Sequence, residues 1–188
     1  MTKTSNSGVD LIKSFEGLRL RAYLCPARIW TIGYGHTKSV TRGDEINQAK
    51  ASSLLREDLK WAEGAVEKYI SVPLTSNQHA ALVSFTFNLG AGALKKSTLR
   101  KRLNAGNYKA AAKELLKWNK ARNSKGRLVV LSGLTRRRIA EKKLFENSEV
   151  QLELPLAPSK VETKDTAKVN PWITLFKAIA ALFTAHKK

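Results

Sequence analysis

The sequence predicts an α+β chain in which one short β-hairpin segment is followed by a long run of helices. Three observations support this prediction. Residues 18–40 have a strand-like pattern, residues 47–70 carry apolar residues at helical spacing, and capping residues and glycines divide residues 75–147 into further helices. With 188 residues and 43% hydrophobic content, the chain can bury one core, or one core and a short appendage.

The first two elements are predicted to meet at Glu16. Residues 7–16 form a short amphipathic helix, whose apolar side consists of Val9, Leu11, Ile12 and Phe15. Gly17 supplies a left-handed stop, so that Glu16 lies at the C-terminal end of this helix. From residue 18 to residue 40, aromatic and β-branched residues are interleaved with Pro26, Gly33 and Gly35, as expected of a small twisted hairpin sheet.

A long helix is predicted next, capped by Asn47 and running to about Ile70, and its length suits a bridge between two lobes. Residues 75–78 have the pattern of a capping box that opens a helix through Leu89, which Gly90 ends. Further helices are expected at about 98–105, 108–120 and 134–147. These helices are expected to be separated at Gly92, Gly106, Gly126 and Gly133.

The composition divides the chain into a folded domain at 1–148, a linker at 149–170 and a cationic amphipathic helix at 171–188. The linker contains Pro155 and Pro158 and lacks periodicity. Asn170 and Pro171 form a strong helix start, and the apolar residues after them fall on one half of a helical wheel. About fifteen helical residues span roughly 22 Å, which is short of a hydrocarbon core of roughly 30 Å. We therefore expect this helix to lie in the interface of an anionic membrane or lipopolysaccharide, the alternative being that it docks on the domain or on a second copy.

Charge and cysteine content limit the partners. The 34 Lys and Arg residues exceed the 15 Asp and Glu residues by 19, so the chain favours polyanions, which include nucleic acid, anionic membranes and the polymers of a bacterial envelope. The basic residues are spread along the chain without a nucleic-acid motif, so no specific nucleic acid is expected. The single cysteine, Cys25, excludes an intrachain disulfide and a thiolate zinc cluster, and we expect neither a metal nor a cofactor.

Glu16 is a candidate general acid. Cleavage of a glycosidic bond needs one group that protonates the leaving oxygen and a second that attacks the anomeric carbon or activates water. The negative end of the helix and apolar neighbours such as Phe15 disfavour an ionised carboxylate, so the protonated form of Glu16 should persist to higher pH.

Several motifs resemble the phage-type lysozymes of glycoside hydrolase family 24. They are residues 16–23 (EGLRLRAY), Cys25, residues 31–37 (TIGYGHT), residues 74–88 and the group Gly133-Leu134, Arg137-Arg138 and Glu141. The resemblance covers roughly residues 7–147 and implies a lysozyme-like fold, with a hairpin lobe and a larger helical lobe beside a glycan cleft. It implies Glu16, Cys25 and Thr31 as catalytic residues, and Arg137, Arg138 and Tyr34 are the candidate substrate-binding residues. It does not decide which arginine lines the cleft near Glu16.

Cys25 stands where many relatives carry aspartate. It could act as a thiolate nucleophile, or help Thr31 to hold an attacking water. A neutral thiol cannot act as a carboxylate, so a mechanism with a second acidic group at this position does not fit the sequence. His36 is interpreted as a structural hydrogen-bonding residue of the hairpin and is left out of the catalytic set.

The resemblance implies an endolysin, a monomeric muramidase that hydrolyses the β-1,4 bond between N-acetylmuramic acid and N-acetylglucosamine in bacterial peptidoglycan. The alternatives are a lytic transglycosylase and a non-enzymatic basic protein that binds membrane or nucleic acid. The polar N-terminus, MTKTSNSGVD, lacks the apolar core of a signal peptide. We therefore expect residence in the host cytoplasm and release to the cell wall through holin-type lesions.

Overall fold

The computed structural model describes residues 2–123 and 126–147, so that the predicted linker and tail helix lie outside the described residues. The described part contains seven helices and four short strands. In chain order they are α1 (Asn6–Glu16), β1 (Arg19–Leu24), β2 (Trp30–Gly33), α2 (Gln48–Tyr69), α3 (Ser76–Leu89), α4 (Ala91–Lys96), α5 (Thr98–Asn104), α6 (Tyr108–Leu115), β3 (Lys120–Arg122), β4 (Leu128–Val130) and α7 (Ser132–Glu146).

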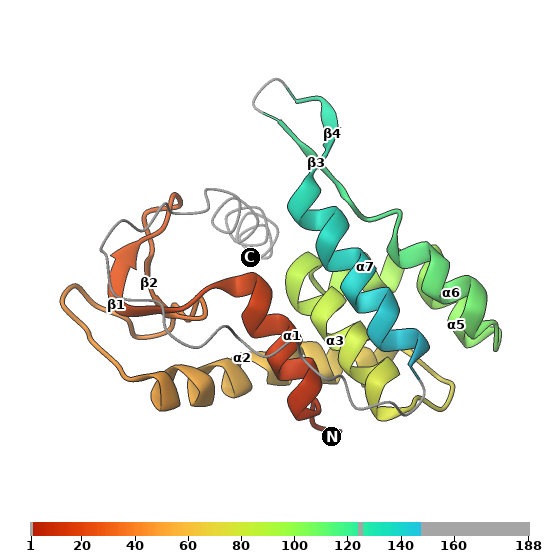
Figure 1. The fold of residues 1–188 in the computed structure, drawn as a ribbon, viewed down its shortest axis with the longest axis horizontal. Coiled ribbons are helices and arrows are strands. Elements are labelled where there is room, and N and C mark those ends of the chain that lie inside the picture. Colours follow the sequence, from red (N-terminus) through yellow and green to blue (C-terminus); the bar gives the residue numbers. More distant parts are fainter. Residues whose placement is uncertain (1, 124–125, 148–188) are drawn as a thin grey trace, which may run out of the picture.

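These elements form two lobes joined by α2 (Figure 1). The antiparallel pair β1–β2 forms the hairpin lobe, in which Tyr23 pairs with Thr31. Helices α3 to α7 form the larger lobe, and α2 contacts both β2 and α3. A second antiparallel pair, β3–β4, projects beyond the start of α7 (Figure 1). The predicted arrangement of a hairpin lobe, a helical lobe and a long connecting helix is confirmed.

The predicted starts of the helices after Asn47 and Thr75 are also confirmed, because these two side chains make the capping bonds, whereas α7 begins at Ser132, before the predicted residue 134, and α4 was not predicted. Asn47 Oδ1 accepts a hydrogen bond from the amide of Lys50 at 2.8 Å and begins α2. Thr75 and Gln78 form both bonds of the capping box at the start of α3. Gly17 ends α1 with a φ of 70°, but its ψ of 148° lies in an extended region open to glycine and not in the expected left-handed helical region.

The prediction for residues 108–120 is wrong at its C-terminal end. Helix α6 ends at Leu115, and residues 120–122 form strand β3, which pairs with the unpredicted strand β4. Gly92 and Gly133 lie inside α4 and α7 instead of between helices. Gly106 and Gly126 have positive φ angles of 76° and 74°, as expected of glycines in the turns between elements.

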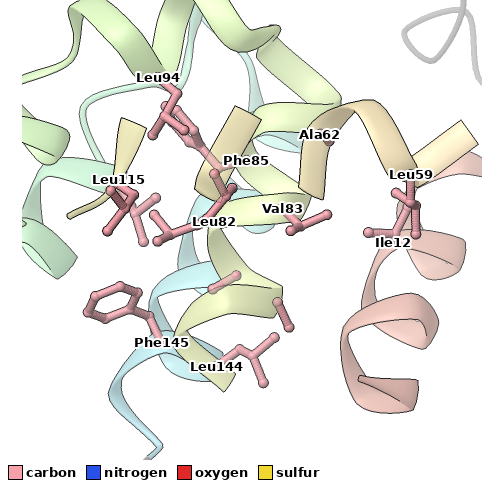
Figure 2. Packing of buried hydrophobic residues seen from close by; sticks show 14 of the residues in the cluster. Ile12, Leu59, Ala62, Leu82, Val83, Phe85, Leu94, Leu115, Leu144 and Phe145 are labelled. Atoms are coloured by element: carbon pink, nitrogen blue, oxygen red, sulfur yellow. The ribbon is translucent and has the colours of Figure 1, made fainter. Parts of the chain in front are cut away.

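The core lies mainly between α2, α3 and the helices around them, and it includes Leu59, Val83 and Phe85 (Figure 2). At one point α1 and α3 approach so closely that only glycine fits. A Cβ atom built on Gly8 would lie 2.5 Å from the Cβ atom of Ala80. The two helices run in the same direction (Figure 1), so this contact also brings their C-terminal ends together. Glu16 is the last residue of α1, and its position therefore depends on this packing.

Candidate active site

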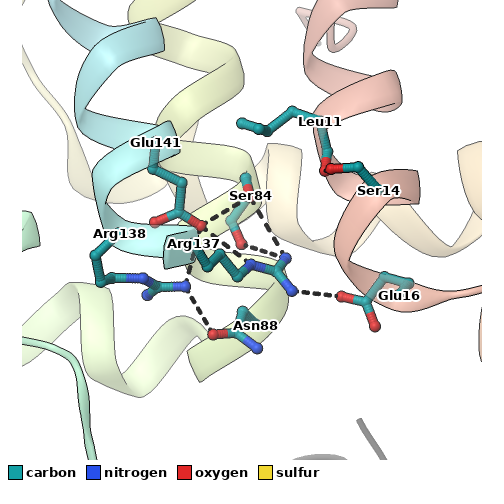
Figure 3. A network of polar contacts seen from close by, with 8 residues as sticks. All are labelled: Leu11, Ser14, Glu16, Ser84, Asn88, Arg137, Arg138 and Glu141. Atoms are coloured by element: carbon teal, nitrogen blue, oxygen red, sulfur yellow. Dashed lines mark hydrogen bonds and ion pairs between the residues drawn. The ribbon is translucent and has the colours of Figure 1, made fainter. Parts of the chain in front are cut away.

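Glu16 is buried at the end of α1 and is hydrogen-bonded to an arginine that lies 121 residues later in the sequence. The Nη1 atom of Arg137, in α7, donates a hydrogen bond to Glu16 Oε1 at 2.8 Å (Figure 3). The side chains of Arg137 and Glu16 are 5% and 6% exposed. A charged hydrogen bond in such surroundings is short and strongly oriented, so Arg137 fixes the direction of the Glu16 carboxyl group.

Arg137 is itself fixed by Glu141, one turn further along α7. Glu141 Oε1 accepts hydrogen bonds from Arg137 Nε at 3.2 Å, from Arg138 Nη2 at 3.0 Å and from the hydroxyl of Ser84 at 2.8 Å. Arg138 Nη2 also donates to Asn88 Oδ1 at 2.7 Å. Figure 3 shows these side chains converging from α1, α3 and α7. The network contains two cations and two carboxyl groups, and its charges balance when both carboxyl groups are ionised.

The structure adds a cation to the surroundings of Glu16 that its neighbours in sequence do not reveal. Burial and the negative end of α1 favour a neutral carboxyl group, whereas the guanidinium of Arg137 favours an ionised one. The first two effects follow from the sequence around Glu16, whereas the contact with Arg137 depends on the fold. Burial also lowers the pKa of Arg138 to about 10, and Glu141 opposes this change. Arg138 therefore still carries its charge at neutral pH.

The hairpin lobe places Cys25 and Thr31 on either side of the turn between β1 and β2. Both residues are buried, and Cys25 is a free cysteine. The amide of Cys25 donates to the carbonyl oxygen of Ile29 at 3.0 Å, and the hydroxyl of Thr31 donates to the same oxygen at 3.0 Å. Since its proton is used in this bond, the Thr31 hydroxyl is oriented to accept a hydrogen bond, for example from a water molecule.

Tyr23 lies opposite Thr31 in the β1–β2 pair and is a further candidate for the site, to which the sequence analysis assigns no role. Burial raises the pKa of Tyr23, Arg19 opposes this effect, and Cys25 and Glu16 both contribute in the same direction as burial. The phenol therefore lies within electrostatic range of one candidate catalytic residue from each lobe. Its position at the end of the 16–23 motif, two residues before Cys25, is the signal that could have indicated it.

Two of the candidate substrate-binding residues are in positions that favour structural roles. Arg138 has no solvent-exposed surface. Tyr34 is buried in the main hydrophobic cluster, and the ammonium group of Lys13 lies 5.6 Å from the centre of its ring. Arg137, the third candidate, is the arginine that touches Glu16.

His36 joins the hairpin lobe to the long helix. Its Nδ1 atom lies 2.9 Å from Asp58 Oδ1, and Asp58 belongs to α2. The predicted hydrogen-bonding role therefore has a partner outside the hairpin. Within residues 2–123 and 126–147, no group of three or more His, Cys, Asp or Glu side chains is arranged to hold a metal ion. None of the helices in this part combines the length and apolarity needed to cross a membrane.

Comparison with known proteins identifies the family. The sequence profile of the phage lysozyme family matches residues 13–141. The endolysin of Acyrthosiphon pisum secondary endosymbiont phage 1 is 48% identical over 144 residues, which are 77% of this chain and 98% of that protein. The endolysin of Salmonella phage P22 is 44% identical over 126 residues, which are 64% of this chain and 86% of that protein.

A solved structure supports the same conclusion. The muramidase domain of SpmX from Asticaccaulis excentricus superposes with a TM-score of 0.74 at 44% sequence identity, covering 78% of this chain and 99% of that domain. The expected α+β lysozyme-like fold is thereby confirmed. Since the family profile, the endolysin relatives and the muramidase structure agree, the chain belongs to the phage lysozyme family.

Proposed function

We propose that the protein is a muramidase (EC 3.2.1.17), which hydrolyses the β-1,4 bond between N-acetylmuramic acid and N-acetylglucosamine in bacterial peptidoglycan. The observation that supports this proposal most directly is the buried carboxyl group of Glu16, oriented by Arg137 at 2.8 Å at the junction of the two lobes. The endolysin and muramidase relatives support the same reaction class. The large positive charge of the chain suits an anionic cell-wall polymer.

Glu16 is the general acid of this proposal. In the reaction, the bond between the anomeric carbon and the leaving oxygen breaks while Glu16 transfers its proton to that oxygen. Arg137 orients the carboxyl group before the transfer and stabilises the carboxylate afterwards. The attacking water releases one proton to the solvent as it bonds to the anomeric carbon, and Glu16 regains a proton from the solvent for the next turnover.

Cys25 and Thr31 act on the opposite face of the sugar. Thr31 accepts a hydrogen bond from the attacking water, and Cys25 assists in holding that water. A direct attack by the water inverts the configuration at the anomeric carbon, whereas a covalent glycosyl-Cys25 intermediate leads to retention. NMR of the first product therefore separates the two roles, and we expect inversion.

The decisive experiment compares Glu16→Gln with Asp10→Asn, which neutralises an exposed carboxylate on the same helix. Clearing of purified peptidoglycan should stop with Glu16→Gln and continue unchanged with Asp10→Asn, while thermal melts show both variants folded. Mass spectrometry of the released fragments should show hydrolysed muramic acid ends. Normal clearing by a folded Glu16→Gln variant, or 1,6-anhydro ends, would refute the proposal.

The tail is proposed to add a membrane-binding function. Residues 171–188 combine an apolar face with lysines, which suits the interface of an anionic membrane or lipopolysaccharide. Truncation after Pro158 should leave the clearing of isolated peptidoglycan intact, and should reduce leakage of anionic vesicles and killing of intact Gram-negative cells. A truncated protein that kills as well as the full chain would contradict this role.

Release to the cell wall through holin-type lesions is also proposed, because the chain is similar to phage endolysins. Expression of the protein alone should be tolerated by the host, and co-expression of a holin should cause lysis. Efficient lysis without any membrane lesion would show another route.

A further inference from the structure

An exposed tryptophan of α2 is stacked on a phenylalanine of α3. Trp61, in α2, keeps 48% of its surface exposed although it is a large apolar residue. Its ring is stacked on that of Phe87, in α3, with the ring centres 6.0 Å apart and the planes inclined by 29°. The phenylalanine ring therefore packs against one face of the indole, and much of the indole remains exposed to solvent.

The aromatic pair lies at the same end of the packed helices as Glu16. Gly8 of α1 meets Ala80 of α3, and the two helices run in the same direction. Glu16 follows Gly8 by eight residues and Phe87 follows Ala80 by seven, which at about 1.5 Å per residue gives advances of roughly 12 and 10 Å. Ser84, one turn before Phe87, contacts Arg137 of the Glu16 network.

The position of Trp61 along α2 places it near the hairpin lobe as well. Asp58 lies one turn before Trp61 on α2 and is bonded to His36 of the hairpin lobe. Trp61 therefore lies on α2 between the residue that contacts the hairpin lobe, Asp58, and the end of α3, where it contacts Phe87. A glycan that reaches Glu16 between the lobes would pass close to such a residue.

We propose that Trp61, supported by Phe87, is a stacking platform for a sugar ring of the glycan strand, away from the bond that is cut. This inference rests on the proposed function. One face of a pyranose ring presents several C–H groups and packs flat on an aromatic ring, whereas the hydroxyl and acetamido groups at its edge need polar partners. The indole offers both an apolar face and an N–H donor. An N-acetylhexosamine unit therefore fits this surface better than an aliphatic ligand does.

The binding test uses the Glu16→Gln background, in which no cleavage is expected, and chitotetraose as the probe. Trp61→Ala should weaken binding about tenfold, as for the loss of an aromatic anchor, and Trp61→Phe should stay within about threefold. Ile139→Ala is the control, because Ile139 is also a large exposed apolar residue but lies on α7. Chitotetraose should also change the tryptophan fluorescence, and this change should be smaller in Trp61→Phe.

A kinetic test uses the otherwise unmodified enzyme. Trp61→Ala should raise KM for soluble glycan strands and leave kcat nearly unchanged, because stacking away from the cut bond is equally strong before and during the reaction. Binding of chitotetraose that stays within twofold in folded Trp61→Ala, or no binding in the Glu16→Gln parent, would overturn the platform. If the unmodified enzyme still releases hydrolysed fragments, only the platform is refuted; if it releases none, the proposed function fails.

Discussion

Replacement of Glu141 by glutamine tests whether the buried charges around Glu16 work as one unit. Glu141 is fully buried, and one of its oxygen atoms accepts hydrogen bonds from Ser84, Arg137 and Arg138. The substitution keeps the shape and an acceptor oxygen but removes the negative charge. The network then contains two buried guanidinium groups, from Arg137 and Arg138, and only one carboxyl group, that of Glu16.

The expected cost is about 3 kcal/mol of unfolding free energy, at the lower end of the roughly 3–5 kcal/mol for breaking a buried ion pair, because the amide still accepts hydrogen bonds. Glu146→Gln is the matched control, since Glu146 forms a more exposed pair with Lys142 on the same helix at the same i,i+4 spacing. Its cost should be below about 0.5 kcal/mol. Urea unfolding at pH 7, followed by circular dichroism, measures both values.

The same substitution should change the pH dependence of activity. Without the negative charge of Glu141, the field of Arg137 at Glu16 is less compensated, and the ionised form of Glu16 becomes more favourable. A general acid works in its protonated form, so the alkaline limb of the clearing rate should move to lower pH. A loss of less than about 1 kcal/mol together with an unchanged pH profile would refute the idea that Glu141 acts on Glu16 through Arg137.

Three further predictions concern the scaffold. Asp58→Asn should cost about 1–2 kcal/mol in urea unfolding, because it weakens the half-buried bond to His36, whereas the exposed Glu57→Gln should cost little. Burial lowers the pKa of His79, and Glu63 and Glu67 oppose this change. The unfolded chain therefore binds a proton at His79 more readily than the folded domain does, so the domain loses stability as the pH falls below the ordinary histidine pKa near 6.5. His79→Gln should therefore reduce the fall in melting temperature between pH 7.5 and pH 5, and an equal fall in both proteins would contradict this. Gly8→Ala should lower stability by about 1–3 kcal/mol, since its Cβ atom would overlap Ala80, and a neutral effect on unfolding would show that α1 shifts easily.

Features fixed by local chemistry could be predicted from the sequence. The caps at Asn47 and Thr75 are bonds between residues three positions apart, so the starts of α2 and α3 follow from short stretches of sequence. The end of α1 at Gly17 is similar, because only glycine adopts its backbone angles readily. Glu16 could be assigned to a helix end for the same reason, and the motif resemblance added its candidate role.

Features fixed by distant contacts could not be predicted. Arg137 and Glu16 are separated by 121 residues, and Arg137 and Ser84 by 53, so nothing in the sequence around Glu16 indicates which arginine it meets. The β3–β4 pair could not be predicted because its strands have three residues each and because β4 consists of apolar residues alone, without the alternation of apolar and polar residues that indicates a half-buried strand. Local propensity in α6 also gave no sign of where the helix should stop.

The two halves of the proposed site are positioned by different parts of the molecule. Glu16 depends on the packing of α1 against α3 and on Arg137 of α7, whereas Cys25 and Thr31 depend on the turn of the β1–β2 hairpin. The hairpin is tied to the long helix through His36 and Asp58, and that helix packs on α3. The spacing between the acid and the water-binding residues therefore depends on α2 as well as on the short connection from Glu16 to β1, although α2 contributes no proposed catalytic group. A substitution at Asp58 should accordingly lower activity more than it lowers substrate binding, because it loosens the geometry between the two halves without removing a contact to the glycan.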